Sequence, residues 1–114
     1  MITISIVRGP RRRIESFAVS GHAGYDDPGR DIVCAGVSAV TVGAVNAIEK
    51  LTGIVPEAEM RSGFLTAKMP RDADPALSDR AQLLLEGMVV ALEAIVEQYG
   101  KYVQIQDEIA QEGG

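Results

Sequence analysis

The chain begins with MITISIVRGPRRRIESFAVS (residues 1–20), a segment with two strand patterns separated by a turn. Isoleucines alternate with small polar residues over positions 1–8, and this period of two is typical of a half-buried β-strand. Gly9 and Pro10 then interrupt the pattern, and a second strand pattern follows over 14–20. The stretch therefore predicts a β-hairpin that starts a sheet.

Downstream of the hairpin, two segments have the apolar spacing of helices. The first ends near Gly53, while the second begins with Asp74 and Pro75, an N-cap and first-turn pair, and ends at Gly100. The predicted apolar stripes are Val33, Val37, Val40, Ala44, Ile48 and Leu51 in the first helix, and Leu77, Ala81, Leu84, Met88, Leu92, Ile95 and Tyr99 in the second. Each stripe needs an apolar surface to cover.

Three further strands complete the predicted sheet. Residues 55–60 and 64–69 form a second hairpin around a turn at Gly63, and 102–106 form a last strand before a polar tail. The predicted order is β-β-α-β-β-α-β. We expect an α+β fold of about five strands with two long helices packed on the sheet, in a single domain over residues 1–114.

Composition narrows the possible partners. The chain has a formal net charge of -5 and a pI near 4.8, whereas surfaces that bind nucleic acid usually cluster Lys and Arg. We therefore expect no direct nucleic-acid partner. The local exception, Arg8 with Arg11 to Arg13, is interpreted as a solvated hairpin tip rather than as a binding patch.

Other sequence features concern the cellular compartment and the oligomeric state of the protein. No charged start leads into a long apolar stretch, and no apolar run reaches the ~18 residues that span a bilayer. A single cysteine suits a reducing compartment, so we expect a cytoplasmic protein without membrane contact. Because small catalytic domains often gain rigidity by pairing, we also expect a homodimer.

The chain contains one cysteine, Cys34, and one histidine, His22, so a thiol–imidazole pair within a subunit can only join these two. Cys34 falls at the predicted start of the first helix, after a glycine-rich loop over 21–33. A helix N-terminus favours the thiolate, and its free N–H groups can hold an oxyanion. Two plainer interpretations stay open: a small core residue for Cys34 and a turn residue for His22.

An acidic residue before the cysteine has two competing roles. Asp31 would either orient His22 as the third member of a triad, or cap the helix by accepting the N–H of Cys34. Asp26 and Asp27 are alternative orienting groups on the loop. A zinc site needs three or four ligands that this pattern does not supply, so we expect no metal and no cofactor.

Glycines in the loop suit close approach of a substrate backbone. Gly21, Gly24 and Gly29 can take positive φ angles, and Gly21 is a candidate hinge. Ser38 lies one helical turn after Cys34, where its hydroxyl would either support the thiol or bond to the preceding turn.

Two runs carry a family resemblance. The run GHAGY (21–25) and the run GRDIVCAGVSAV (29–40) resemble the signature of the ribosomal-processing cysteine proteases, at the family's spacing. The order of elements and the closing strand are similar over essentially the whole chain. One departure is Gly36, where the family more usually has Ala.

The resemblance implies a cysteine endopeptidase that acts on the N-terminal extension of a bacterial large-subunit ribosomal protein, number twenty-seven, and that forms a homodimer. It implies Cys34 as nucleophile, His22 as base and Asp31 at the family's acidic position. Substrate-binding positions are expected at Gly21, Gly24, Tyr25 and Ser38. Two alternatives stay open: a non-catalytic, ribosome-associated peptide-binding module and a purely structural dimerisation domain.

Overall fold

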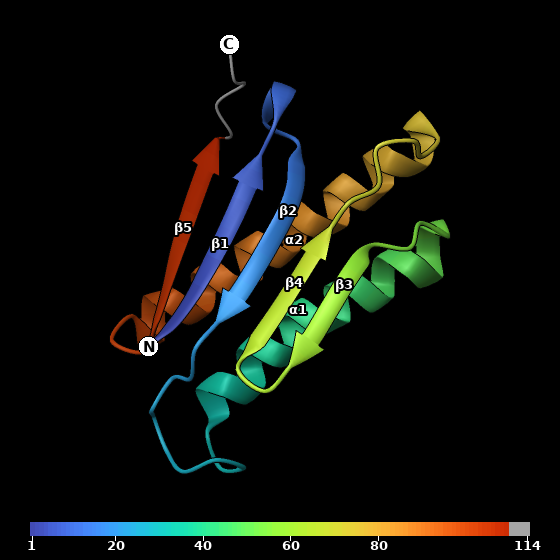
Figure 1. The fold of residues 1–114 in the computed structure, drawn as a ribbon. Helices are drawn as coiled ribbons and strands as arrows, with labels where there is room; N and C mark the ends of the chain where they lie inside the picture. Colours follow the sequence, from blue (N-terminus) through green and yellow to red (C-terminus); the bar gives the residue numbers. More distant parts are fainter. Residues whose placement is uncertain (110–114) are drawn as a thin grey trace.

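The fold follows the predicted order β-β-α-β-β-α-β, and the α+β class is confirmed (Figure 1). The computed structural model describes residues 1–109. The elements are β1 (Ile2–Arg8), a short 3-10 turn (Pro10–Arg12), β2 (Ile14–Ser20), α1 (Ile32–Thr52), β3 (Glu57–Arg61), β4 (Phe64–Lys68), α2 (Pro75–Tyr99) and β5 (Val103–Ile109). The strands form one sheet in the order β3-β4-β2-β1-β5.

The first strand lies inside the sheet and sets its register. β1 pairs with β2 in the antiparallel sense and with β5 in the parallel sense. Ile4 faces Val19 on β2 and Ile105 on β5. The alternation of β1 is confirmed, because Ile2, Ile4 and Ile6 are all buried while the residues between them are half-buried. Pairing of both edges of β1 explains why its inward side chains are wholly removed from solvent.

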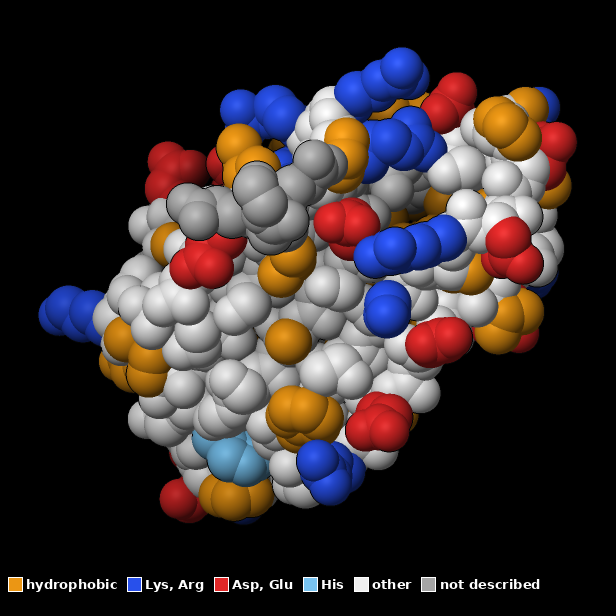
Figure 2. Space-filling model, turned by 45° about the horizontal axis from the view of Figure 1, so that its top comes forward, with side chains coloured by type: hydrophobic (Ala, Val, Ile, Leu, Met, Phe, Trp, Pro, Cys, Tyr) orange, Lys and Arg blue, Asp and Glu red, His pale blue; other side chains and the backbone are white. Residues whose placement is uncertain are grey.

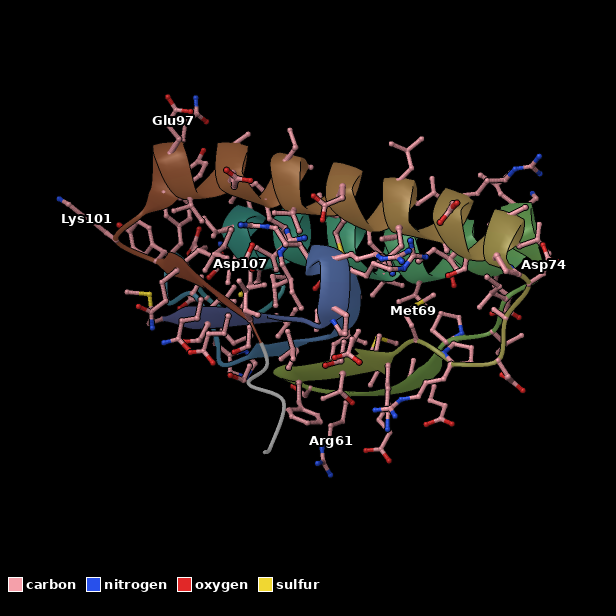
Figure 3. All side chains as sticks on the ribbon, turned by 90° about the horizontal axis from the view of Figure 1, so that it is seen from above. Arg61, Met69, Asp74, Glu97, Lys101 and Asp107 are labelled. Carbon is pink, nitrogen blue, oxygen red and sulfur yellow. The ribbon has the colours of Figure 1, made fainter. Side chains whose placement is uncertain are left out.

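Both helices cover the same face of the sheet, as the view from above shows (Figure 3). α1 packs against α2, and α2 also contacts β5 and β2. This arrangement places the core in one layer between the helices and the inward side chains of the strands. It also brings the N-terminus of α1 to the end of the sheet where β2 finishes and the β3–β4 turn lies (Figure 1).

The apolar stripes differ from the prediction in both helices. In α1, Val40 is half-buried and Thr41 is buried in its place, with its hydroxyl donating to the Val37 carbonyl at 2.8 Å. Leu51 is 66% exposed, and Thr52 is buried in its place because its hydroxyl donates to the Ile48 carbonyl at 2.6 Å and so leaves no unpaired polar group. In α2, Leu85 is fully buried whereas Leu84 is half-buried. Each difference arises because the predicted stripe advances three residues at that point, whereas the buried side chain lies four residues on.

Two strand boundaries also differ from the prediction. Val55 lies before β3 and is exposed rather than paired. β5 runs on to Ile109, because it pairs with β1 over seven successive positions, so three residues assigned to the polar tail belong to the sheet. The rest of the predicted tail, 110–114, lies outside the described residues.

α1 is long and apolar enough to cross a membrane by length and composition, whereas no apolar run of that length was predicted from the sequence. Core helices of water-soluble domains pass the same test. Here a stripe that includes Val37, Ala44 and Ile48 is buried in the core. The exposed large apolar side chains of α1 are Ile32 and Leu51, at its two ends.

A buried arginine joins three elements away from the cysteine. The Arg8 side chain on β1 donates to Asp107 on β5 at 2.8 and 3.1 Å, and to Glu86 on α2. The hydrogen bonds that Arg8 donates to Asp107 and Glu86 raise its pKa above the ordinary value despite its burial. Arg8 is therefore a structural cation, and its charge is already neutralised.

Candidate active site

The candidate site starts at the N-terminus of α1, which a carboxylate caps. One oxygen of Asp31, Oδ1, accepts the N–H groups of Val33 and Cys34, both at 3.0 Å, and the Asp31 carbonyl accepts from Ala35 at 3.0 Å. The interpretation of Asp31 as a helix cap is therefore confirmed. The N–H groups of residues 33–35, at the helix end expected to hold an oxyanion, therefore carry hydrogen bonds to Asp31.

The second carboxylate oxygen of Asp31 holds the loop. Its Oδ2 accepts the backbone N–H of Tyr25 at 3.0 Å and that of Asp26 at 3.3 Å. All side-chain hydrogen bonds given to Asp31 within residues 1–109 come from backbone N–H groups, and none comes from His22. Asp31 thus ties the loop to the helix that carries Cys34, and the structure does not show it orienting the imidazole.

The same bonds set the charge state of Asp31. Burial by itself would raise the pKa of this carboxyl. The four backbone N–H groups, from Cys34, Asp26, Tyr25 and Val33, outweigh burial and hold the pKa of Asp31 below its ordinary value. The carboxylate is therefore ionised at neutral pH and keeps both sets of hydrogen bonds.

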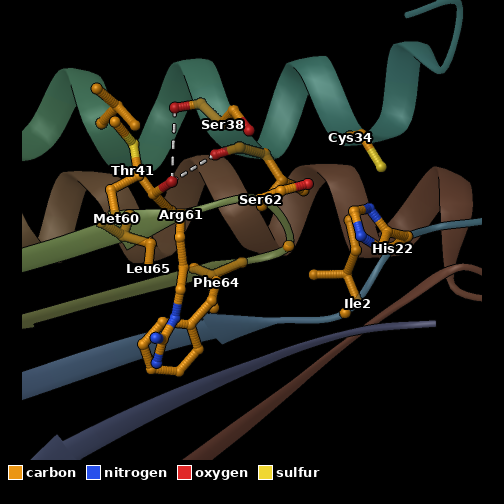
Figure 4. Close-up of a pocket in the computed structure, with 15 residues that line it drawn as sticks. Ile2, His22, Cys34, Ser38, Thr41, Met60, Arg61, Ser62, Phe64 and Leu65 are labelled. Carbon is orange, nitrogen blue, oxygen red and sulfur yellow. Dashed lines mark hydrogen bonds between the residues drawn. The ribbon is translucent and has the colours of Figure 1, made fainter. Parts of the chain in front are cut away.

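Cys34 and His22 lie at one end of a cleft. The Cys34 side chain points toward the His22 ring in Figure 4. Cys34 is half-buried, and its Sγ accepts the backbone N–H of Ala23 at 3.3 Å. His22 is exposed, and it appears at the surface in Figure 2. The thiol is thus neither fully buried nor free, and Ala23 is a contact that the sequence did not predict.

The backbone around His22 is fixed by two neighbouring segments. The N-terminal amine of Met1 donates to the His22 carbonyl at 2.7 Å, and Gly21 donates to the Gly63 carbonyl at 2.9 Å. Gly63 has a φ of 70°, and a Cβ added there would lie 2.6 Å from Nε2 of His22. The β3–β4 turn therefore sets the position of the imidazole ring. Sequence reasoning placed a turn at Gly63 but had no signal for this contact.

The cleft runs from the Cys34–His22 end along α1 and has a volume of about 500 Å³. One wall is α1, and the other is the β3–β4 hairpin (Figure 4). The lining residues are Ile2, Val19, Gly21, His22, Cys34, Val37, Ser38, Thr41, Val42, Met60, Arg61, Ser62, Gly63, Phe64 and Leu65. Most of these side chains are apolar, so the cleft suits an uncharged or apolar ligand segment.

The four expected substrate-binding residues fall into two groups. Gly21 and Ser38 line the cleft. Gly24 is not among its lining residues, and neither is Tyr25. The Tyr25 ring instead lies edge-on to Tyr99 and Tyr102, with ring centroids 5.8 and 5.2 Å apart. Tyr25 therefore anchors the loop to the end of α2 and the start of β5.

The remaining polar groups of the loop do not build a metal site. Asp26 and Asp27 are exposed, and the Asp27 N–H donates to the Asp26 carboxylate at 2.7 Å. Within residues 1–109, no three His, Cys, Asp or Glu side chains are grouped so that they could hold a metal ion. The thiol of Cys34 and the imidazole of His22 are the nucleophilic and basic side chains among the residues that line the cleft.

A half-buried thiol facing a histidine, at the end of a peptide-sized cleft, defines the class of thiol-dependent hydrolases. Comparison with known proteins gives the particular family. The family described as "Cysteine protease Prp" matches residues 1–104. The chain therefore belongs to the Prp cysteine proteases, and the predicted resemblance is confirmed.

Sequence relatives agree with this assignment. The chain is 43% identical over 101 residues to the ribosomal processing cysteine protease Prp of Bacillus subtilis, covering 87% of this chain and 90% of the relative. It is 36% identical over 105 residues to the protein of the same name from Staphylococcus aureus, covering 92% and 97%. The two alternatives without catalysis are thereby set aside, and the protein is a cysteine protease.

Solved structures also agree with the fold. The S. aureus Prp protease in complex with a covalently linked product peptide matches with a TM-score of 0.86 at 34% identity, over 95% of this chain and 100% of the other. The same protease in complex with a substrate peptide matches with a TM-score of 0.80 at 33% identity, over the same shares.

Proposed function

We propose that this protein removes the N-terminal extension of a bacterial large-subunit ribosomal protein, number twenty-seven, during ribosome assembly in the cytoplasm, with Cys34 as nucleophile and His22 as general base. The observation that carries the proposal is the Cys34 thiol facing the His22 ring at the end of an apolar cleft. The names of the relatives, which are ribosomal processing proteases, supply the substrate class.

The reaction follows from the groups at the cleft. The Cys34 sulfur, having given its proton to His22, attacks the scissile carbonyl and forms a C–S bond. The C–N bond then breaks, and His22 returns the proton to the leaving amine. A water molecule, deprotonated by His22, hydrolyses the thioester and releases the second product. His22 thus carries the proton of the Cys34 thiol to the leaving amine, and then the proton of water to the departing Cys34 thiolate.

The hydrogen bond from Ala23 to the thiol suggests a role for the loop backbone. Ala23 is buried, and its N–H donates to Sγ at 3.3 Å, so it stabilises negative charge on sulfur. This donor takes over part of the role expected of the helix N–H groups that Asp31 occupies. Asp31 acts in this proposal as a positioning residue that fixes loop and helix together.

The cleft and the charge of the chain define the substrate. An apolar wall formed by side chains such as Val37, Val42 and Phe64 suits bulky apolar or aromatic residues next to the scissile bond. The peptide enters extended, because its backbone must reach the thiol at one end of the cleft between α1 and the β3–β4 hairpin. A net charge of -5 attracts a basic ribosomal segment and raises the encounter rate at low salt.

The homodimer stays a prediction, and α1 offers a surface for it. A second copy is the occupant that we expect, because α1 is strongly apolar and two of its large apolar side chains are left exposed in one chain. Ile32 and Leu51, at the two ends of α1, are more than half exposed. Light scattering at ~100 μM should show a dimer, since even a micromolar pair associates at that concentration. A monomer there would contradict the assembly.

The substrate proposal is tested with peptides from the ribosomal N-terminus. Mass spectrometry of the products should show one cleavage site in the extension and no cleavage of folded proteins. Peptides with aromatic residues replaced by Ala should have a lower kcat/KM, and peptides with basic residues replaced by Gln should lose their salt dependence. Equal rates for aromatic and alanine peptides would remove the apolar-pocket argument, and salt-independent rates would remove electrostatic steering.

A further inference from the structure

A second cleft lies at the end of the molecule opposite the catalytic site. It has a volume of about 650 Å³ and forms where the tip between β1 and β2 meets the first turns of α2. Its lining residues are Gly9, Pro10, Arg11, Arg13, Ile14, Glu15, Met69, Pro70, Arg71, Ser78 and Gln82. Nothing in the proposed peptidase reaction uses this cleft.

Arginines from two separate segments meet there. Arg11 and Arg13 come from the hairpin tip, and Arg71 comes from the connection before α2. Figure 2 shows Lys and Arg side chains gathered over this end of the molecule, and Figure 3 shows nitrogen-bearing side chains beside Met69. Arg11 is exposed at the hairpin tip, as expected of a solvated turn, and Arg71 adds a second exposed arginine to the cleft from a distant part of the chain.

The arginines differ in how they are held. Arg13 donates to Asp79 at 2.8 Å and to the Ser78 hydroxyl at 2.6 Å, so its guanidinium is oriented. Arg11 and Arg71 are exposed, and the described residues give neither of them an ion pair. Two cations thus remain available beside an oriented one. The cleft also contains one carboxylate, Glu15, whose side chain folds over Gly9.

The backbone of the tip is strained where the arginines stand. Arg11 and Arg12 have φ angles of 59° and 60°, and they are the residues other than glycine with positive φ within 1–109. Residues with a Cβ rarely adopt this left-handed backbone conformation, so glycine would suit both positions better. The turn is closed by hydrogen bonds from Gly9 to the Arg13 carbonyl at 2.8 Å and from Arg12 to the Gly9 carbonyl at 3.0 Å. Such strain is commonly found at functional sites.

We propose that this cleft binds phosphate groups of RNA, with Arg11 and Arg71 as the contacting residues and Arg13 as an oriented neighbour. A guanidinium presents a planar fork of donors that matches phosphate oxygens. The acidic remainder of the chain repels RNA, so contact is confined to this end. The choice of RNA rests on the proposed function, because a ribosomal substrate brings the enzyme next to ribosomal RNA.

The test measures binding of a short, labelled, single-stranded RNA to the full chain by fluorescence anisotropy at several salt concentrations. The double variant Arg11→Gln with Arg71→Gln should weaken binding by about tenfold. It should also make the slope of log K against log salt shallower by about 1.4, since each contact to a single strand contributes about 0.7. The matched control, Lys50→Gln with Lys101→Gln, changes the net charge equally at exposed sites elsewhere and should bind like the wild type.

A single substitution separates binding from stability. Arg11→Gly removes the guanidinium and relieves the left-handed strain, so it should raise the melting temperature while it weakens RNA binding. Cleavage of a free peptide should be unchanged in all these variants, so failure of RNA binding and failure of the peptidase proposal are distinguishable. The proposal would be overturned if the wild type did not bind RNA, or if the lysine control lost as much binding as the arginine variant. It would also be overturned if the arginines bound vesicles of acidic phospholipid and not RNA.

Discussion

The two helices begin with the same residue type and differ in what that residue holds. Asp74 caps α2 with a single side-chain hydrogen bond, from Leu77 at 3.3 Å, at an exposed position. Asp31 caps α1 with two bonds from the helix and accepts two more from the loop. One cap only starts a helix, whereas the other joins a thiol to the loop that carries the histidine. An aspartate at a helix N-terminus therefore only caps the helix in α2, whereas in α1 it also holds the loop of the candidate site.

Among the variants that compare the two caps, the larger effect is expected from removing the charge of Asp31. Asp31→Asn keeps one acceptor oxygen for the helix but replaces the oxygen that accepts from Tyr25 and Asp26. We expect kcat/KM to fall by about 10- to 100-fold, because small misplacements of catalytic groups have that effect. Asp74→Asn should leave peptide cleavage unchanged. Similar activities for the two variants would end the distinction between the caps.

The next effect concerns the turn that faces α1. Gly63→Ala places a Cβ 2.6 Å from the His22 ring and should reduce activity by about tenfold or more. Gly53 is the matched control, because its φ of 76° is similar and nothing lies within 4 Å of an added Cβ. Both variants should lose about 1 to 2 kcal/mol of stability from backbone strain. Thermal melts measure the loss of stability from backbone strain, and kcat/KM measures the displacement of His22. Equal kcat/KM for Gly63→Ala and Gly53→Ala would show that Gly63 does not position His22.

A smaller effect is expected from the aromatic anchor of the loop. Tyr25→Ala removes the contacts with Tyr99 and Tyr102 and should lower kcat/KM several-fold, since each aromatic contact contributes about 0.5 to 1.5 kcal/mol. Tyr25→Phe keeps the rings in contact and should restore activity. Failure of Phe to rescue would show that Tyr25 acts through its hydroxyl and not through the packing of its ring.

Acid should weaken the Asp31 cap. The pKa of Asp31 is held below its unfolded value of about 3.9, so its stabilising contribution is complete above that value and is lost as the pH falls through the folded pKa. The melting temperature of the wild type should therefore drop faster below about pH 4 than that of Asp31→Asn. Parallel curves for the two proteins would show that the cap carries no ionised carboxylate.

The sequence predicted the parts of the fold that depend on local signals. The isoleucine alternation of β1, the two aspartate caps and the Gly53 terminus were all confirmed, because each depends on residues near one another in the chain. Thr52 was missed because an apolar pattern ranks Leu51 above it, although a threonine bonded to its own helix can be buried.

The site was predicted less completely, for a physical reason. Cys34 and His22 followed from their being the single residues of their types. The contact of Gly63 with His22, and the packing of Tyr25 on Tyr99 and Tyr102, join segments far apart in the chain. Their positions depend on how α2 and the β3–β4 hairpin dock on the rest of the sheet, which no local pattern records.

The central claim is that Cys34 performs the cleavage. The most direct measurement is mass spectrometry of a peptide from the ribosomal N-terminal extension after incubation with the wild type, Cys34→Ala or Cys34→Ser. Cleavage should fall by about 10⁴-fold or more in both variants, because the nucleophile contributes to the barrier far more than to packing. Thermal melts should remain close to that of the wild type, since the side chain is half-buried. Cleavage by a folded Cys34→Ala variant at a rate near that of the wild type would contradict the claim.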